Sequence, residues 1–257
     1  MSPKSFLRTS VITTCLALAT TSTPVQAGTD ILHFFVRAAL TNDGVATNAS
    51  GTVTVRENKQ GNADNETVGL TLKGLNTNAP YTLQVSTADD TNLTSVSDFM
   101  TDSRGRANLN FSNLGNHSSV GKGKLPLPDA MDPVSLLRSF AVVDTNTLAV
   151  LLSADLAASN HLQYLIKRDL SMNGVTATLR IQANNQNARL RLSARGLVAT
   201  NDYYLLLNGG IVQTNSTDAH GRLQLSATLA NPLDVLDLRS VIVSDTAANT
   251  VLSTTLP

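Results

Sequence analysis

Apolar and polar residues alternate with a period of two along most of the chain. Val53 and Val55 alternate with threonine and arginine, and Leu70 and Leu72 alternate with glycine, threonine and lysine. This pattern is typical of strands that are buried on one face. Helical periodicity is weak beyond the N-terminal segment, and one short turn of helix is expected near 131–137. The sequence therefore predicts an all-β protein.

The second half of the chain repeats the first half. Four pairs of segments match, given first copy before second: Phe34–Gly44 and Tyr164–Gly174, Lys73–Leu75 and Arg195–Leu197, Thr101–Arg106 and Thr217–Arg222, Arg138–Ser139 and Arg239–Ser240. The offset between matched residues falls from 130 to 101 along the chain, which gives the first copy the longer loops. The longest of these loops is expected near 113–133. A repeat of this length indicates a duplicated structural unit.

Eight strands are expected in each copy. Those of the first copy lie near 33–40, 52–57, 67–73, 81–86, 95–100, 107–111, 139–143 and 148–153. Those of the second copy lie near 163–170, 176–182, 188–194, 203–207, 210–214, 223–227, 240–244 and 250–254. Clusters of Asn, Asp and Gly separate them, as turns require.

Copies of this size with many short strands favour two antiparallel β-sandwiches in tandem, at 28–155 and 156–257. In strand rhythm, though not in any motif, the chain resembles the Ig-like or fibronectin-like modules of exported bacterial proteins, which implies only architecture. A single merged barrel of sixteen strands is the alternative. The join near 154–161 is short and poor in glycine and proline, so the copies are expected to be closely coupled.

Residues 1–27 have the features of a secretory signal. Lys4 and Arg8 precede an apolar stretch, and Val25-Gln26-Ala27 forms a small-x-small cleavage site before Gly28. The expected location is therefore extracellular or on the cell surface, with the periplasm also open. Cys15, the one cysteine of the chain, lies inside this signal, so neither a disulfide nor a thiol nucleophile is expected in the mature protein. Lipidation at Cys15 is the alternative to ordinary cleavage.

The composition narrows the functional classes. The chain has 257 residues, 42% hydrophobic and 4% aromatic, with 19 Lys and Arg against 19 Asp and Glu. Removal of 1–27 takes away two cations and leaves 17 against 19, a net charge of −2. This balance favours neither nucleic acid nor an anionic membrane as a partner. No later segment has the run of ~18 apolar residues of a transmembrane helix.

Motifs of catalysis and metal binding are missing from the sequence. The four histidines, His33, His117, His161 and His220, lack metal-ligand spacing, and neither G-x-S-x-G nor H-E-x-x-H occurs. Three groups of acidic residues lack the spacing of a calcium cage: Asp89 with Asp90, Asp98 with Asp102, and Asp129 with Asp132. No cofactor, metal or catalytic residue is therefore predicted.

The repeated motif Thr-Asp-x-x-Gly-Arg predicts a turn in each copy. Asp102 and Asp218 are expected to accept hydrogen bonds from main-chain N–H groups, and Gly105 and Gly221 are expected to have positive φ angles. The motif is thus interpreted as structural.

Arginines are concentrated in the second copy. Residues 28–155 hold 9 cations against 13 anions, and 156–257 hold 8 against 6. Alternation places Arg180, Arg189, Arg191 and Arg195 on the outward face of two neighbouring strands. The first-copy positions matched to them are Thr54 or Arg56, Gly69, Thr71 and Lys73, a nearly neutral face. Because adjacent like charges are unfavourable unless an anion covers them, the four arginines are the candidate binding residues for carboxylate, phosphate or sulfate groups.

The sequence favours a non-catalytic binding or assembly module, exported to the cell surface or the medium. Its partner is expected to be an anionic surface polymer or another copy of the chain, bound head to tail through the arginines. A secreted hydrolase with dispersed acidic residues is the alternative, because two carboxylates can come from distant strands.

The signal interpretation gives the first prediction. The intact mass of the secreted protein should correspond to a chain that begins at Gly28, since Val25-Gln26-Ala27 precedes the expected cut. A diacylated product that begins at Cys15 would contradict it.

Overall fold

The computed structural model describes residues 30–42, 44, 48–113 and 123–257. Strands dominate it, and its helical segments are single short 3₁₀ elements, so the all-β prediction is confirmed. The expected signal at 1–27, including Cys15, and His117 lie outside the described residues. Within the described part, no helix has the length and hydrophobicity needed to span a membrane.

Each expected strand is present. The first copy contains β1 (Ile31–Asn42), β2 (Ser50–Gln60), β3 (Ala63–Lys73), β4 (Pro80–Thr87), β5 (Thr94–Met100), β6 (Ala107–Ser112), β7 (Leu125–Pro126), η3 (Asp129–Met131), η4 (Val134–Leu136), β8 (Leu137–Asp144) and β9 (Val150–Asp155). The short η5 (Leu156–Ala158) follows at the join between the copies. The second copy contains β10 (His161–Met172), β11 (Val175–Asn184), β12 (Ala188–Arg195), β13 (Asp202–Leu207), β14 (Gly210–Ser216), β15 (Leu223–Leu229), η6 (Pro232–Asp237), β16 (Ser240–Asp245) and β17 (Thr250–Thr255). The short β7 was not expected, and the turn expected at 131–137 is formed by η3 and η4.

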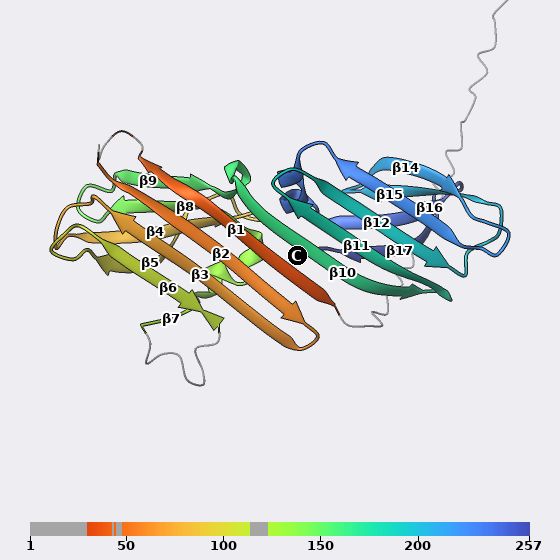
Figure 1. The fold of residues 1–257 in the computed structure, drawn as a ribbon, viewed down its shortest axis with the longest axis horizontal. Helices are drawn as coiled ribbons and strands as arrows, with labels where there is room; N and C mark the ends of the chain where they lie inside the picture. The colour runs from red at the N-terminus through yellow and green to blue at the C-terminus, as the bar shows by residue number, and fades with distance from the viewer. Residues whose placement is uncertain (1–29, 43, 45–47, 114–122) are drawn as a thin grey trace, which may run out of the picture.

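Both copies pair their strands in the same order. In the first copy β1, β2, β3 and β6 are successive neighbours, and β5, β4, β8 and β9 form a second set. In the second copy β10, β11, β12 and β15 are neighbours, and β14, β13, β16 and β17 form the other set. Figure 1 shows the two copies side by side, with the long strands of the first sets crossing in front. The sequence repeat is therefore also a repeat of strand order. The copies differ in one pairing, because the end of β1 at Thr41 and Asn42 also pairs with β9 and joins the two sets of the first copy in one sheet, whereas the second set of the second copy is a separate sheet.

The copies join through their first strands. β1 pairs with β10 in antiparallel register, from Ile31 opposite Lys167 to Arg37 opposite His161. We call this pairing the seam. It joins the two first sets into one front sheet in the order β15-β12-β11-β10-β1-β2-β3-β6 (Figure 1). The order ends at β15 on one side and at β7, beside β6, on the other, so the alternative of a single closed barrel is wrong.

Alternation directs one face of the front sheet into the core. Leu70 on β3 and Leu192 on β12 occupy matched positions of the two copies, and they are 2% and 1% exposed. At the seam, Phe34 and Tyr164 are register partners whose rings meet edge to face, with centroids 6.1 Å apart. The buried apolar residues of both copies form one continuous cluster. The seam therefore lies over shared core and not over a solvent gap.

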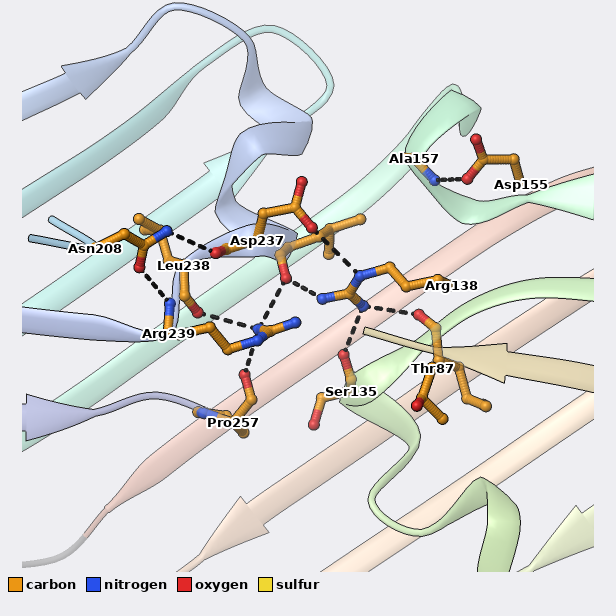
Figure 2. Close-up of polar contacts among 12 residues, drawn as sticks. Thr87, Ser135, Arg138, Asp155, Ala157, Asn208, Asp237, Leu238, Arg239 and Pro257 are labelled. Atoms are coloured by element: carbon orange, nitrogen blue, oxygen red, sulfur yellow. Dashed lines mark hydrogen bonds and ion pairs between the residues drawn. The ribbon is translucent and has the colours of Figure 1, made fainter. Parts of the chain in front are cut away.

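Behind the seam, Arg138 links the copies (Figure 2). Its Nη1 donates to the carbonyls of Ser135 and Leu137, at 3.1 and 2.8 Å. Its Nη2 donates to the carbonyl of Leu236 on η6, and its Nε lies 3.5 Å from Asp237 Oδ1. Burial lowers the pKa of Arg138, and the charge of nearby Arg239 lowers it further. One guanidinium therefore fixes η6 of the second copy against the first.

Arg239 is the matched residue of the second copy. Its Nη1 donates to the carbonyls of Leu236 and Leu238, at 3.0 and 3.1 Å, which repeats the contacts of Arg138 within its own copy. It also donates to the carbonyl of Pro257 at 3.1 Å (Figure 2). A third arginine, Arg168 on β10, lies 3.0 Å from Asp30 Oδ2. The cations behind the seam are thus held by carbonyl and carboxylate groups.

The predicted turn occurs in both copies. Asp102 Oδ1 accepts the main-chain N–H groups of Arg104 and Arg106, at 2.8 and 2.9 Å. Asp218 Oδ1 accepts those of His220 and Arg222, at 2.9 and 2.8 Å. Gly105 and Gly221 have φ angles of 69° and 67°, and a Cβ at either would lie about 2 Å from a carbonyl oxygen. Their structural interpretation is confirmed.

The core assignment gives the second prediction. L70A and L192A should each lower the free energy of unfolding by about 2–5 kcal/mol, because each leaves a cavity in a packed core. Urea denaturation measures the loss. T71A and S193A, on the outward face of the same strands, are the controls and should change stability by at most about 0.5 kcal/mol. Near-zero loss in both leucine variants would refute the register.

Candidate functional site

Cations gather on the outward side of the front sheet in the second copy. The group comprises Lys167 on β10, Arg180 on β11, Arg189, Arg191 and Arg195 on β12, and Arg222 directly before β15, all exposed. We call this surface the basic face. It contains six of the eight Lys and Arg residues of 156–257, whereas the other two, Arg168 and Arg239, lie behind the seam.

Three of the cations stand in one row across neighbouring strands. Lys167 lies opposite Arg180, and Arg180 lies opposite Arg191. Adjacent strands are about 4.8 Å apart, so the three side chains leave the sheet at that spacing. Like charges directly opposite each other destabilise a sheet. The row therefore favours any anion that lies over it.

Few protein groups offset this charge. Arg180 Nη2 donates to Gln182 Oε1 at 3.2 Å, and Arg195 Nε donates to Thr176 Oγ1 at 2.9 Å. The ion pairs found among the described residues involve Lys59, Arg138 and Arg168, none of which belongs to the basic face. On the described strands that carry this face, one carboxylate points outward, that of Asp169, and its Oδ1 accepts the Thr178 hydroxyl at 2.8 Å.

Residues of the basic face line three hollows. A hollow of about 510 Å³ lies at the turns, beside Arg195, His220 and Arg222, and two more lie over the strands. One, of about 300 Å³, is lined by Arg180, Gln182, Asn184, Asn187, Arg189 and Arg191. The other, of about 610 Å³, extends along β10, β11, β12 and β15 and includes Asp169, Arg195 and Arg222. Guanidinium and amide groups converge in the smaller hollow. Both groups donate hydrogen bonds, and guanidinium binds carboxylate or phosphate oxygens in pairs.

All four predicted arginines are exposed and lie together on two paired strands. Their role in binding stays a prediction. Sequence reasoning missed Lys167 and Arg222, although Lys167 is in phase with outward neighbours on β10, and Arg222, directly before β15, is in phase with the outward Gln224. The expected matches of Arg180 to Thr54 and of Arg195 to Lys73 agree with the strand register, whereas those of Arg189 to Gly69 and of Arg191 to Thr71 are wrong. With Leu70 equivalent to Leu192, Arg189 and Arg191 correspond to Thr67 and Gly69, and Thr71 corresponds to Ser193.

A second cluster is buried in the first copy. The chain has two glutamates, Glu57 and Glu66, which are register partners on β2 and β3 and are 2% and 1% exposed. The matched positions of the second copy are Ala183 and Ala188, which are also buried register partners. The fold therefore accepts an alanine pair at this place, and the carboxyl groups require a separate explanation.

The glutamates hold the chain that follows the long loop. Glu66 Oε1 accepts the N–H of Val134 at 3.0 Å, and Glu57 Oε2 accepts the N–H of Ser135 at 3.3 Å. These N–H groups open η4, whose preceding residue, a proline, provides no side-chain cap. In the second copy, the side chain of Asn231 caps η6 instead. The glutamates thus accept the free N–H groups at the start of η4, as the side chain of Asn231 does at the start of η6.

Oxygen atoms of Glu57, Asp64 and Glu66 lie within 4.8 Å of one another, the one such group among the described residues. Lys59 Nζ lies 2.9 Å from Asp64 Oδ2 and supplies a cation at this place. This ion pair and the bonds to η4 engage oxygens of all three carboxylates, whereas Asp64 Oδ1 is buried without a hydrogen-bond partner in the described part of the chain. The aspartates at 89, 90, 98, 102, 129 and 132 do not form such a group.

The described histidines lie on separate elements. His33 is on β1, where its Nδ1 is 2.9 Å from Asn58 Oδ1, His161 begins β10, and His220 is in the turn before β15. They form no metal-binding group within the described residues.

No protein-family model matches the chain, and no curated protein matches it. The geometry of its own residues therefore carries the functional argument.

The buried glutamates give the third prediction. Burial raises the pKa of Glu66 from its ordinary value of 4.5 to about 7, and the charge of Glu57 adds to this; burial also raises the pKa of Glu57. Because the pKa of Glu66 is raised in the folded state, the protonated carboxyl contributes to the free energy of unfolding. This contribution is fully present below about pH 4.5 and is lost as the pH rises to about 7. The free energy of unfolding should fall by roughly 2–3 kcal/mol over this range.

E66Q should remove most of this slope, because glutamine accepts a hydrogen bond but does not ionise in this range. Urea denaturation between about pH 5 and 8 measures it, and the slope is the readout, since the substitution also changes absolute stability. D89N, at an exposed loop residue, is the control and should leave the slope unchanged. Equal slopes for wild type and E66Q would contradict the prediction.

Proposed function

We propose that the chain is an exported, non-catalytic binding module made of two Ig-like β-sandwiches, at 28–155 and 156–257, which binds an anionic polysaccharide at the cell surface or in the medium. The repeated strand order and the inward apolar faces support the sandwich assignment. The signal-like N-terminus supports export.

The basic face carries the proposal. Six cations stand there with one outward carboxylate among the described residues of the same strands, and three of the six form a row. Such a surface is costly to assemble without an anionic partner. Five of the six cations are arginines, whose planar guanidinium groups bind carboxylate, phosphate and sulfate through paired hydrogen bonds.

The hollows support binding more than hydrolysis. Glycoside hydrolysis in most families requires two carboxyl groups that flank the substrate. The three hollows of the basic face include one carboxylate, that of Asp169, whose Oδ1 already accepts a hydroxyl hydrogen bond. The alternative of a secreted hydrolase therefore lacks a specific observation in its favour.

The acidic excess of the first copy gives less support to head-to-tail self-association than its charge count suggests. The 13 acids of 28–155 include Glu57 and Glu66, which are buried, and the 9 cations include Arg138, which lies behind the seam. Without these three residues, 11 acids stand against 8 cations, and the excess falls from −4 to −3. Asp64 is paired with Lys59, and Asp30 with Arg168. An anionic polymer is therefore the better partner, and self-association is a competing outcome of the test.

The fourth prediction follows. Reversal of Arg180 and Arg191 to glutamate should weaken binding to polygalacturonate by roughly tenfold or more, because each arginine offers a charge-assisted pair of hydrogen bonds. Titration calorimetry on the mature protein measures binding, with dextran as the neutral polymer. The matched control is R104E/R106E, which makes the same change of charge at a turn of the first copy.

Two results would overturn the proposal. One is equal binding by the two double variants and the wild type. The other is that the wild type does not bind the polymer but forms an oligomer in sedimentation, which salt and R180E/R191E both disrupt. The basic face would then be a contact between copies of the chain.

A further inference from the structure

The seam places residues of both copies on one outward surface. On the row that crosses it, Asn184 lies opposite Gln163, Gln163 opposite Phe35, and Phe35 opposite Arg56. The row extends over β11, β10, β1 and β2, with two strands from each copy. Whatever binds along it therefore contacts both copies at once.

A hollow of about 260 Å³ lies at this place. It is lined by Phe35 of the first copy and by His161, Leu162, Gln163, Asn184, Asn185 and Gln186 of the second. We call it the seam hollow. Asn184 also lines the smaller hollow of the basic face, so the two hollows adjoin. The ring of Phe35 is half-buried and faces outward, whereas the adjacent Phe34 points into the core.

Cations flank the seam hollow on the side of the first copy. Arg56 lies opposite Phe35, and Arg37 lies opposite His161; both arginines are exposed. Neighbouring strands are about 4.8 Å apart and alternate residues about 7 Å, so Arg37 and Arg56 are roughly 8 Å apart at their backbones. Their outward neighbours, Thr54 and Asn58, are polar and uncharged. On the described parts of β1, β2 and β3, no carboxylate points to this side.

This surface has the parts that an acidic sugar chain requires. An aromatic ring offers an apolar surface to the C–H face of a sugar, and the amides of Gln163 and Asn184 can donate to and accept from hydroxyl groups. Guanidinium groups on both sides of the hollow can bind carboxylates. The row from Lys167 to Arg191 lies four residues along the strands from the row of Phe35, so a bound chain runs diagonally across the sheet. It reaches the basic face through the smaller hollow, which Asn184 shares with Arg180 and Arg189.

We propose that a uronic-acid polysaccharide crosses the seam, with a sugar ring on Phe35 in the seam hollow and its carboxylates on the basic face at one side and on Arg37 and Arg56 at the other. The inference rests on the proposed function and adds that the ligand is long enough to span both copies. It also adds that the seam is part of the binding site.

The test compares short and long oligogalacturonides in calorimetric titration of the mature protein. R37E/R56E should weaken binding of a decasaccharide by roughly tenfold or more and leave binding of a disaccharide unchanged, because only the long chain reaches past the seam. F35A should also weaken binding of the decasaccharide. K73E/R106E, with the same charge change away from the seam hollow, should have no effect. Circular dichroism checks that each variant is folded.

The outcomes separate this inference from the proposed function. If R180E/R191E weakens binding and both R37E/R56E and F35A match the wild type, the face binds anions and the seam site is wrong. If dextran sulfate or polyphosphate binds as tightly as the decasaccharide and F35A changes neither, the surface responds to charge alone and the sugar assignment is wrong. If wild type binds no anionic polymer, the proposed function itself fails.

Discussion

The pairing of β1 with β10 is the contact on which the rest of the molecule depends. Each strand is the first of its copy and has an edge that its own copy leaves unpaired at the seam. Exposed edges of this kind invite uncontrolled association. Here they satisfy each other over seven residue pairs, Ile31 to Arg37 against Lys167 to His161. The edge-to-face contact of Phe34 with Tyr164 and the bonds of Arg138 to η6 both require this register.

The same pairing also creates the surface that we propose as functional. Because side chains alternate across a strand, the register that buries Phe34 beside Tyr164 presents Phe35 beside Gln163 on the other face. A slip of one residue would exchange the two phenylalanines and would break the row from Asn184 to Arg56. Core packing and the outward row are thus set by one choice of register.

Inward positions of the two copies agree more closely than outward positions, and one buried pair is an exception. Leu70 and Leu192 are matched and buried, whereas the outward positions beside them carry Gly69 in one copy and Arg191 in the other. Inward packing limits the residues that fit, and outward positions are free to differ. The exception is the buried pair Glu57 and Glu66 of the first copy, whose matched residues in the second copy are Ala183 and Ala188. The glutamates bind the chain that follows the long loop of the first copy, so this difference between the copies goes with the different loop lengths.

Alternation was enough to place the strands and to direct the arginines outward, because both depend on neighbours along the chain. It also carried signals that were missed. Glu57 is in phase with Val55, and Glu66 with Val68, which marks both as inward-facing. Phe35 is out of phase with Phe34, which marks it as outward-facing.

The seam could not be predicted in this way. A strand has the same alternation whether its free edge meets solvent or another copy. Which strands lie at the edges, and in which register they meet, follows from the packing of whole sheets. The seam hollow and the position of Arg56 across from Phe35 were therefore beyond the reach of the sequence pattern.

A net charge close to zero is compatible with a strongly basic binding surface. Outward carboxylates are scarce on the described front sheet, and many aspartates lie instead in turns. Main-chain N–H groups lower the pKa values of Asp102, Asp144 and Asp218, and hydrogen bonds from the side chain and main chain of Asn249 lower that of Asp245. At physiological ionic strength the Debye length is about 8 Å, so an anion over Arg180 responds to the cations beside it and little to aspartates at distant turns. The overall charge therefore argues against nonspecific attraction to polyanions, and it leaves open a local site at which spacing and shape select the polymer.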